Sequence, residues 1–73
     1  MRKYADVNYD NHDLLACIDA VIHSKRDREM LALWLVDHYS QEAIAEMYDM
    51  SVSQTKRNLR RDRERVFRKM RLI

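Results

Sequence analysis

The side chains best suited to chemistry lie in the last third of the chain, where basic groups are concentrated. Residues 53–73 include nine Lys or Arg and two acidic residues, a net charge of +7. Residues 1–52 include five basic and ten acidic residues, a net charge of −5, so the formal net charge of +2 conceals a strong asymmetry. A basic segment that follows an acidic body indicates a surface that binds a polyanion.

The amide and guanidinium groups at the start of this basic segment are of the types that recognise DNA bases. In the major groove Arg pairs with guanine through two hydrogen bonds, and Gln or Asn pairs with adenine. Such contacts come from the first turns of a recognition helix, which we place at about residues 53–62. The predicted base-contacting residues are Ser53, Gln54, Arg57, Asn58 and Arg61.

A second set of polar and basic residues is better placed for phosphate oxygens. Side chains at helix starts bind phosphates together with the free N–H groups found there. The predicted phosphate-contacting residues are Ser40, Gln41, Ser51, Lys56 and Arg60. The later cations, from Arg63 to Arg71, are spread around the predicted helix, so we expect some of them to pair with acidic groups or stay solvated.

Catalysis and metal binding find little support in the sequence. His12, His23 and His38 fall on separate predicted segments, and Cys17 has no obvious base beside it. A glycine-rich phosphate-binding loop is excluded because the chain has no Gly. We therefore expect no catalytic site, no metal site and no cofactor.

The single cysteine and the hydropathy pattern bear on location. Cys17 has apolar neighbours and no second cysteine to pair with, which is typical of a buried thiol in a reducing compartment. No apolar run approaches ~18 residues, so we expect no membrane span. Residues 1–10 lack the apolar stretch of a signal peptide. We expect a cytoplasmic protein that is associated with the nucleoid when bound to DNA.

These side chains need a scaffold, and the composition indicates a helical one. The chain has neither Gly nor Pro, so we predict an all-α fold with short connections. The predicted organisation is an N-terminal tail over residues 1–9 and one four-helix domain over residues 10–73. This domain ends in a helix-turn-helix with a long basic recognition helix. The predicted helix starts are Asp10 or Asn11, Ser24, Ser40, and Ser51 or Ser53.

Apolar spacing predicts how the helices pack. Leu14, Ile18 and Ile22 recur on one face of the first predicted helix. The second predicted helix is apolar around most of its circumference, so we expect it to be the most buried helix. We expect Trp34 to be the largest side chain of the core. The last predicted helix runs to about Leu72 and carries a one-sided stripe for packing on the first: Leu59, Val66, Met70 and Ile73.

A resemblance to a known family is carried by the segment RDREMLALWLVDHYSQEAIAEMYDMSVSQTKRNLRR. It resembles the C-terminal DNA-binding domain, region 4, of bacterial RNA polymerase sigma factors. In that family an Arg-Glu pair precedes a Leu-rich helix, a Ser is followed by Glu-Ile-Ala, and Ile-Ser and Thr-Val-Lys lead into a basic helix. The matching residues here are Arg28-Glu29, Leu31 and Leu33, Ser40, Glu42 through Ile44-Ala45, Met50-Ser51 and Gln54-Thr55-Lys56.

The resemblance covers about two-thirds of the chain, with departures at a few positions. Ala43 stands where Glu is frequent in the family, and Thr55 stands where Val is usual. His38 and Asp49 stand in the two turns where the family often has Gly. Because His and Asp tolerate a left-handed backbone better than most residues, we expect both turns to be kept.

The resemblance implies a sequence-specific DNA-binding transcription regulator that contacts double-stranded DNA, with RNA polymerase as a further partner. At 73 residues the chain has no counterpart of the other sigma domains, so the implied type is a small sigma-like regulator such as phages and mobile elements encode. Helix-turn-helix domains of response regulators share the pattern more distantly.

Two other hypotheses stay open at this point. One is an interaction protein that binds RNA polymerase or another regulator without recognising DNA. The other is a helical module that binds RNA or packages DNA. For a sequence-specific regulator a homodimer is plausible, because one small module offers few base contacts. The candidate dimer surfaces are the first helix and the apolar residues Phe67, Leu72 and Ile73.

Overall fold

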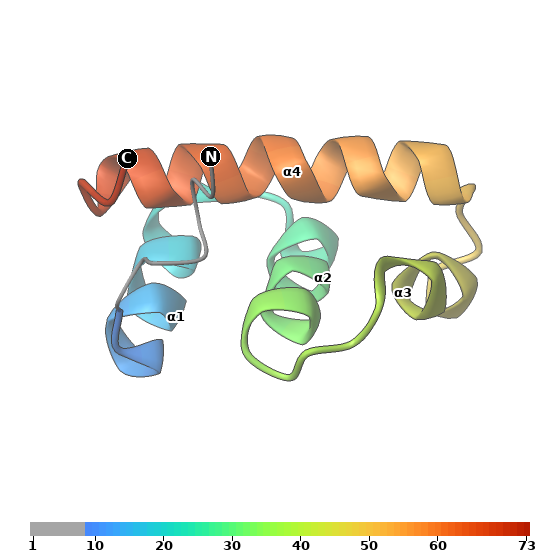
Figure 1. Ribbon diagram of the computed structural model, residues 1–73, viewed down its shortest axis with the longest axis horizontal. Helices are drawn as coiled ribbons and strands as arrows, with labels where there is room; N and C mark the ends of the chain where they lie inside the picture. The colour runs from blue at the N-terminus through green and yellow to red at the C-terminus, as the bar shows by residue number, and fades with distance from the viewer. Residues whose placement is uncertain (1–8) are drawn as a thin grey trace.

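A computed structural model describes residues 9–73, and within them the chain forms four α-helices and no β-strand. The helices are α1 (Asn11–Val21), α2 (Lys25–Leu35), α3 (Gln41–Met47) and α4 (Val52–Lys69). The long α4 lies across α1, α2 and α3 and packs on each of them (Figure 1). The predicted all-α, four-helix class is therefore confirmed. No helix in residues 9–73 combines the length and apolar character needed to cross a membrane.

Each helix begins at a side chain that accepts a hydrogen bond from a backbone N–H in its first turn. Asp10 accepts from His12 at 3.0 Å, and Ser24 Oγ accepts from Asp27 at 3.2 Å. Ser40 Oγ and Ser51 Oγ do the same for α3 and α4, at 3.0 Å and 3.1 Å. The predicted helix starts are thus confirmed, and the structure selects Asp10 and Ser51 from the predicted alternatives.

Three residues with a left-handed backbone end the helices. His38, Asp49 and Arg71 have φ angles of 63°, 55° and 63°. After Asp49 and Arg71, the next N–H returns to a carbonyl five residues earlier, as in the Schellman motif that usually has Gly at this position. The expected turns at His38 and Asp49 are therefore present. Since Arg71 reverses the backbone, α4 ends at Lys69 rather than at the predicted Leu72.

The core draws on all four helices, and α4 supplies its largest side chain. Two predictions about this core are wrong. Trp34 is only partly buried, and Phe67, which was predicted to lie on a dimer surface, is 2% exposed. Both α2 and α4 contact every other helix, and the buried face of α4, which includes Asp62 and Phe67, is wider than the predicted stripe. The buried apolar residues that pack as one cluster are Leu14, Ile18, Ile22, Met30, Leu31, Ile44, Leu59, Val66 and Phe67.

The predicted N-terminal tail over residues 1–9 lies outside the described residues except for Tyr9. The ring centroid of Tyr9 is 5.5 Å from that of Phe67, with the two rings tilted by 55°. Tyr9 therefore adds to the packing around Phe67, which is buried near the end of α4.

Candidate nucleic-acid interface

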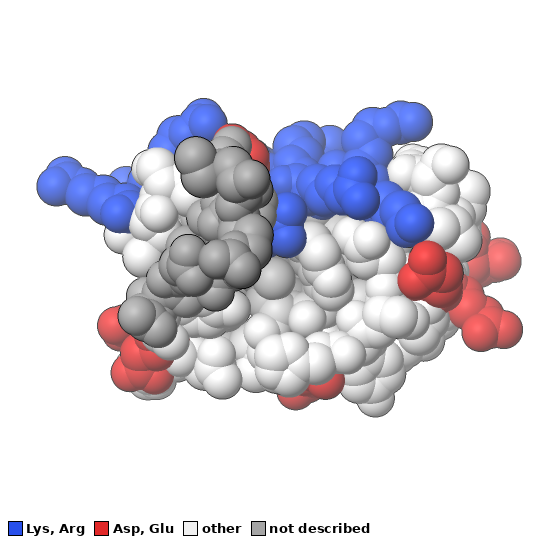
Figure 2. Space-filling model, in the orientation of Figure 1, with Lys and Arg blue, Asp and Glu red and all other residues white. Residues whose placement is uncertain are grey.

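One long face of α4 is strongly basic and points mostly away from the other three helices. Its exposed cations recur at the spacing of a single helix face: Arg57, Arg60, Arg61, Arg65 and Arg68. We call this surface, together with the exposed Ser53 and Gln54, the outer face of α4. Figure 2 shows Lys and Arg gathered along α4, whereas Asp and Glu lie mostly on the side away from it. The charge asymmetry of the sequence is therefore also an asymmetry in space.

Four of the five predicted base-contacting residues share this outer face, because Ser53, Gln54, Arg57 and Arg61 are all exposed. Asn58 is partly buried at the edge of the face. The predicted phosphate-contacting residues are more dispersed. Arg60 lies on the outer face, Ser51 and Lys56 lie beside it on α4, and Ser40 and Gln41 stand at the start of α3.

Capping bonds and burial change which atoms of three of these residues can reach a phosphate. The Oγ atoms of Ser40 and Ser51 each accept a backbone N–H, so their hydroxyl hydrogens are left to donate to a phosphate. Gln41 was predicted to contact phosphate, but its Nε2 atom is buried and has no hydrogen-bond partner within residues 9–73. Gln41 therefore faces the protein and is a poorer phosphate ligand than its position at a helix start indicates.

Internal partners occupy some of the cations on α4. Lys56 Nζ lies 3.4 Å from a carboxylate oxygen of Glu42. The pKa of Glu42 is lowered, first by a hydrogen bond to its own backbone and then by Lys56. Arg61 Nε donates to a carboxylate oxygen of Asp62 at 3.2 Å, which leaves the two terminal nitrogens of its guanidinium available. Within residues 9–73, neither Arg57 nor Arg60 has such a partner, so these two cations are the most available to an anion.

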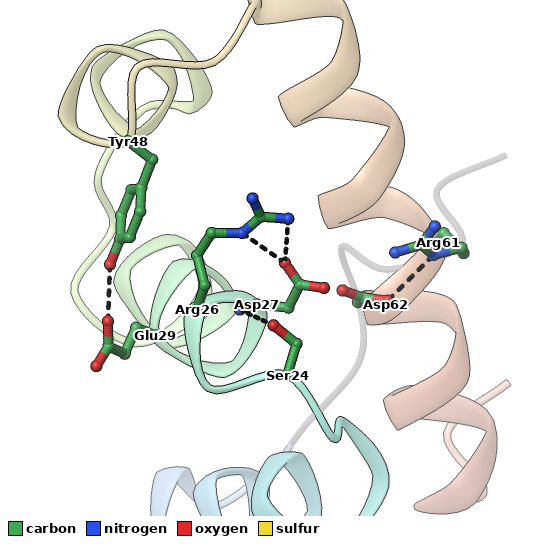
Figure 3. A network of polar contacts seen from close by, with 7 residues as sticks. All are labelled: Ser24, Arg26, Asp27, Glu29, Tyr48, Arg61 and Asp62. Carbon is green, nitrogen blue, oxygen red and sulfur yellow. Dashed lines mark hydrogen bonds and ion pairs between the residues drawn. The ribbon is translucent and has the colours of Figure 1, made fainter.

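The sequence-based prediction missed the orientation of two charged residues of α4 that do not lie on its outer face. Asp62 is 2% exposed, with its carboxylate held by Arg61 (Figure 3). Its position three residues after Leu59 and four before Val66 places it on the buried face, a signal that was present in the spacing. The guanidinium of Arg63 lies over the Trp34 ring, 4.6 Å from its centroid, so Arg63 turns away from the outer face.

Polar contacts also fix the turn between α3 and α4 against α2. Tyr48 donates its hydroxyl to Glu29 Oε1 at 3.2 Å, joining this turn to α2 (Figure 3). Partial burial raises the pKa of Tyr48, and the contact with Glu29 raises it further, so the phenol stays a donor at neutral pH. Because this hydrogen bond fixes the turn against α2, the first residues of α4 have a defined position relative to α2.

The remaining features of the described residues lie away from the outer face. An open cavity of about 320 Å³ lies between α1 and α2, where Leu15, Arg28 and Glu29 are among its lining residues. Burial raises the pKa of the Cys17 thiol, which outweighs the opposing effect of Lys69. In residues 9–73 no three His, Cys, Asp or Glu side chains gather closely enough to hold a metal ion. Comparisons of the chain with protein-family models, with curated proteins and with solved structures each give no match.

Proposed function

We propose that this protein recognises specific sequences in double-stranded DNA and regulates transcription. In this proposal α3, the turn over residues 48–51 and α4 act as a helix-turn-helix, with the first turns of α4 in the major groove. The observation that carries the proposal is the outer face of α4. There a capped, fixed helix start presents Gln54 and Arg57 beside Arg60, and neither of these cations has an acidic partner within residues 9–73.

The proposed recognition follows from side-chain chemistry. Arg57 is exposed and unoccupied, so its guanidinium is free to form the two-bond contact with the O6 and N7 atoms of guanine. Gln54 offers a donor and an acceptor one turn earlier, which suits adenine. Arg61 keeps two terminal nitrogens while Asp62 holds its Nε, so its guanidinium is oriented before DNA arrives. These three residues give α4 the means to distinguish base pairs.

Phosphate contacts position the helix without distinguishing bases. The hydroxyl of Ser51 at the start of α4 and the exposed Arg60 near the middle of the helix fit this role. Lys56 is partly neutralised by Glu42, so its contribution to phosphate binding is expected to be smaller than that of Arg60. A second copy of the chain or RNA polymerase would supply the affinity that a single module lacks. With Phe67 buried, the proposed dimer surface is reduced to α1 and the exposed Ile73.

A second candidate function is favoured by the open cavity between α1 and α2. This cavity combines the exposed apolar side chain of Leu15 with the charged residues Lys25 and Glu29, a mixture suited to a protein partner. In this alternative the protein binds RNA polymerase or another regulator without recognising DNA. The basic outer face of α4 would then contribute only weak, salt-sensitive attraction to nucleic acid.

Selection from a pool of random-sequence duplexes separates the two functions. The proposed function predicts that repeated rounds of binding enrich one motif, and that a duplex carrying this motif binds at least 10³-fold more tightly than random DNA. A palindromic motif would indicate a dimer, whereas a single half-site would indicate action together with RNA polymerase. If no motif is enriched and all duplexes bind with equal, salt-sensitive affinity, the proposed function is wrong.

A further inference from the structure

We propose that the C-terminal half of α4 binds the phosphate backbone of DNA that flanks the recognised bases. This inference rests on the proposed function, and it concerns a surface that base recognition does not use. The residues that carry it are Arg68 and Lys69, which are both exposed in the last turn of α4. We call them the distal pair.

The length of α4 separates the distal pair from the base-contacting residues. The helix is continuous from Val52 to Lys69, and Arg68 lies on the same face as Arg57, eleven residues away. At a rise of ~1.5 Å per residue this separation is about 16 Å along the axis. Since stacked base pairs are spaced ~3.4 Å apart along the DNA axis, 16 Å spans at most roughly five base pairs. The distal pair therefore lies beyond the bases that Arg57 contacts.

The contacts of the distal pair within the protein are confined to the surface. The side chain of Arg68 is 70% exposed, and its ion pair with Glu64 at 3.3 Å lies on the surface of one helix. Exposed pairs of this kind contribute little to stability. Other cations in this half of α4 do have structural roles: Arg63 stacks on Trp34, and Arg65 donates to the carbonyl oxygen of Val21 at 3.3 Å.

DNA phosphate is the partner whose chemistry fits the distal pair best. The outer face of α4 extends from the proposed base contacts to Arg68 with Glu64 as its one acidic residue, and most other acidic groups lie on the side away from it. A helix whose first turns lie in the major groove brings its later cations toward the phosphates along the groove edge. Each phosphate that is neutralised releases condensed counterions, so these contacts have a measurable salt dependence.

The test compares two variants that each lose two exposed cations. Arg68→Gln/Lys69→Gln removes the distal pair, and Lys25→Gln/Arg26→Gln removes two cations at the start of α2 as a matched control. Affinity is measured against salt concentration for a selected duplex and for a random one. Each lost phosphate contact lowers the salt slope by ~0.9, so the distal variant should lose about 1.8 from the slope. The control should keep the wild-type slope.

A second arm tests the position of the contact. Removing about five base pairs from one side of the selected duplex should weaken wild-type binding tenfold or more and leave the distal variant unchanged. Arg68→Lys/Lys69→Arg keeps both charges and should behave as the wild type, which separates loss of charge from loss of fold. Equal slopes and equal losses on truncation in the wild type and the distal variant would overturn the inference.

The two proposals fail in different ways. If selection enriches no motif, base recognition by α4 is wrong, yet the salt slopes on random DNA still test the distal pair. If a motif is enriched but the distal variant keeps the wild-type slope, base recognition stands and the phosphate contact by Arg68 and Lys69 is wrong.

Discussion

Thr55 is a buried residue whose hydroxyl weakens the fold, and replacing it should stabilise the protein. The side chain is 0% exposed in the first turns of α4, and its Oγ1 atom has no hydrogen-bond partner within residues 9–73. Thr55→Val replaces this hydroxyl with a methyl group of nearly the same shape.

The magnitude follows from the cost of burying an unpaired hydroxyl, which is ~1–3 kcal/mol in proteins. Thr and Val are both β-branched and have similar helix propensities, so other terms nearly cancel. We therefore expect Thr55→Val to raise the free energy of unfolding by about 1–2 kcal/mol. For a domain of this size, each 1 kcal/mol raises Tm by roughly 4–8 °C. Urea and thermal unfolding followed by circular dichroism measure both quantities.

Thr55→Ser is the matched control, because it keeps the hydroxyl and removes the methyl group. It should lower the free energy of unfolding by about 1 kcal/mol through the lost burial and the cavity. Neither variant should alter DNA binding, since Thr55 does not reach the outer face of α4. If Thr55→Val leaves stability unchanged or lowers it, the hydroxyl is bonded in solution and the reasoning is refuted.

Three further predictions concern the interface and the turns. Arg57→Ala should weaken binding to a selected duplex by ~1–3 kcal/mol and relax the preference at one base pair in a repeated selection; an unchanged motif would remove Arg57 from the base contacts. Asp49→Gly should raise the free energy of unfolding by about 1 kcal/mol, because Gly adopts the 55° φ angle without a steric cost; a drop in the urea midpoint would contradict this. The pKa of Glu42 is lowered first by a backbone hydrogen bond and then by Lys56, so these contacts stabilise the fold above the ordinary value of 4.5 and are lost as the pH falls below it. Carboxyl NMR shifts should show the Glu42 midpoint rising in Lys56→Met, and an unmoved midpoint would exclude the ion pair as a cause.

Local features of the fold were predictable because they depend on a few neighbouring residues. Ser24, Ser40 and Ser51 each precede a helix, and their side chains satisfy N–H groups that the helix leaves free. The turns at His38 and Asp49 were predictable for a similar reason, since both residue types tolerate the left-handed backbone that ends a helix.

The burial of individual side chains was less predictable because it depends on how the helices cross. A periodic pattern identifies the buried side of α4 but does not give its width, and α4 packs on three helices rather than one. Phe67 is therefore buried beside Tyr9, whereas Trp34 stays at the edge of the core, where its ring carries Arg63. The helical spacing of Asp62 from the buried Leu59 and Val66 predicts that Asp62 is buried too. Its charge predicts the opposite, because unpaired carboxylates are rarely buried.

The candidate interface was predictable in its location but not in its electrostatics. Residue types and spacing placed Gln54, Arg57 and Arg61 on one helix start, and the structure puts them on one exposed face. Sequence spacing does not show which cations are already paired. The contact of Lys56 with Glu42 depends on how α4 packs on α3. The contact of Arg61 with Asp62 depends on the side-chain rotamers of two adjacent residues.

The most direct test of base recognition by α4 is an NMR titration of the labelled protein with a selected duplex and with a scrambled duplex of equal length. The proposed function predicts that the selected duplex causes its largest amide and side-chain shifts at Ser53, Gln54, Arg57 and Arg61, and that the scrambled duplex causes smaller, salt-sensitive shifts along α4. Equal shifts with both duplexes, or shifts centred on the cavity between α1 and α2, would contradict base recognition by this helix.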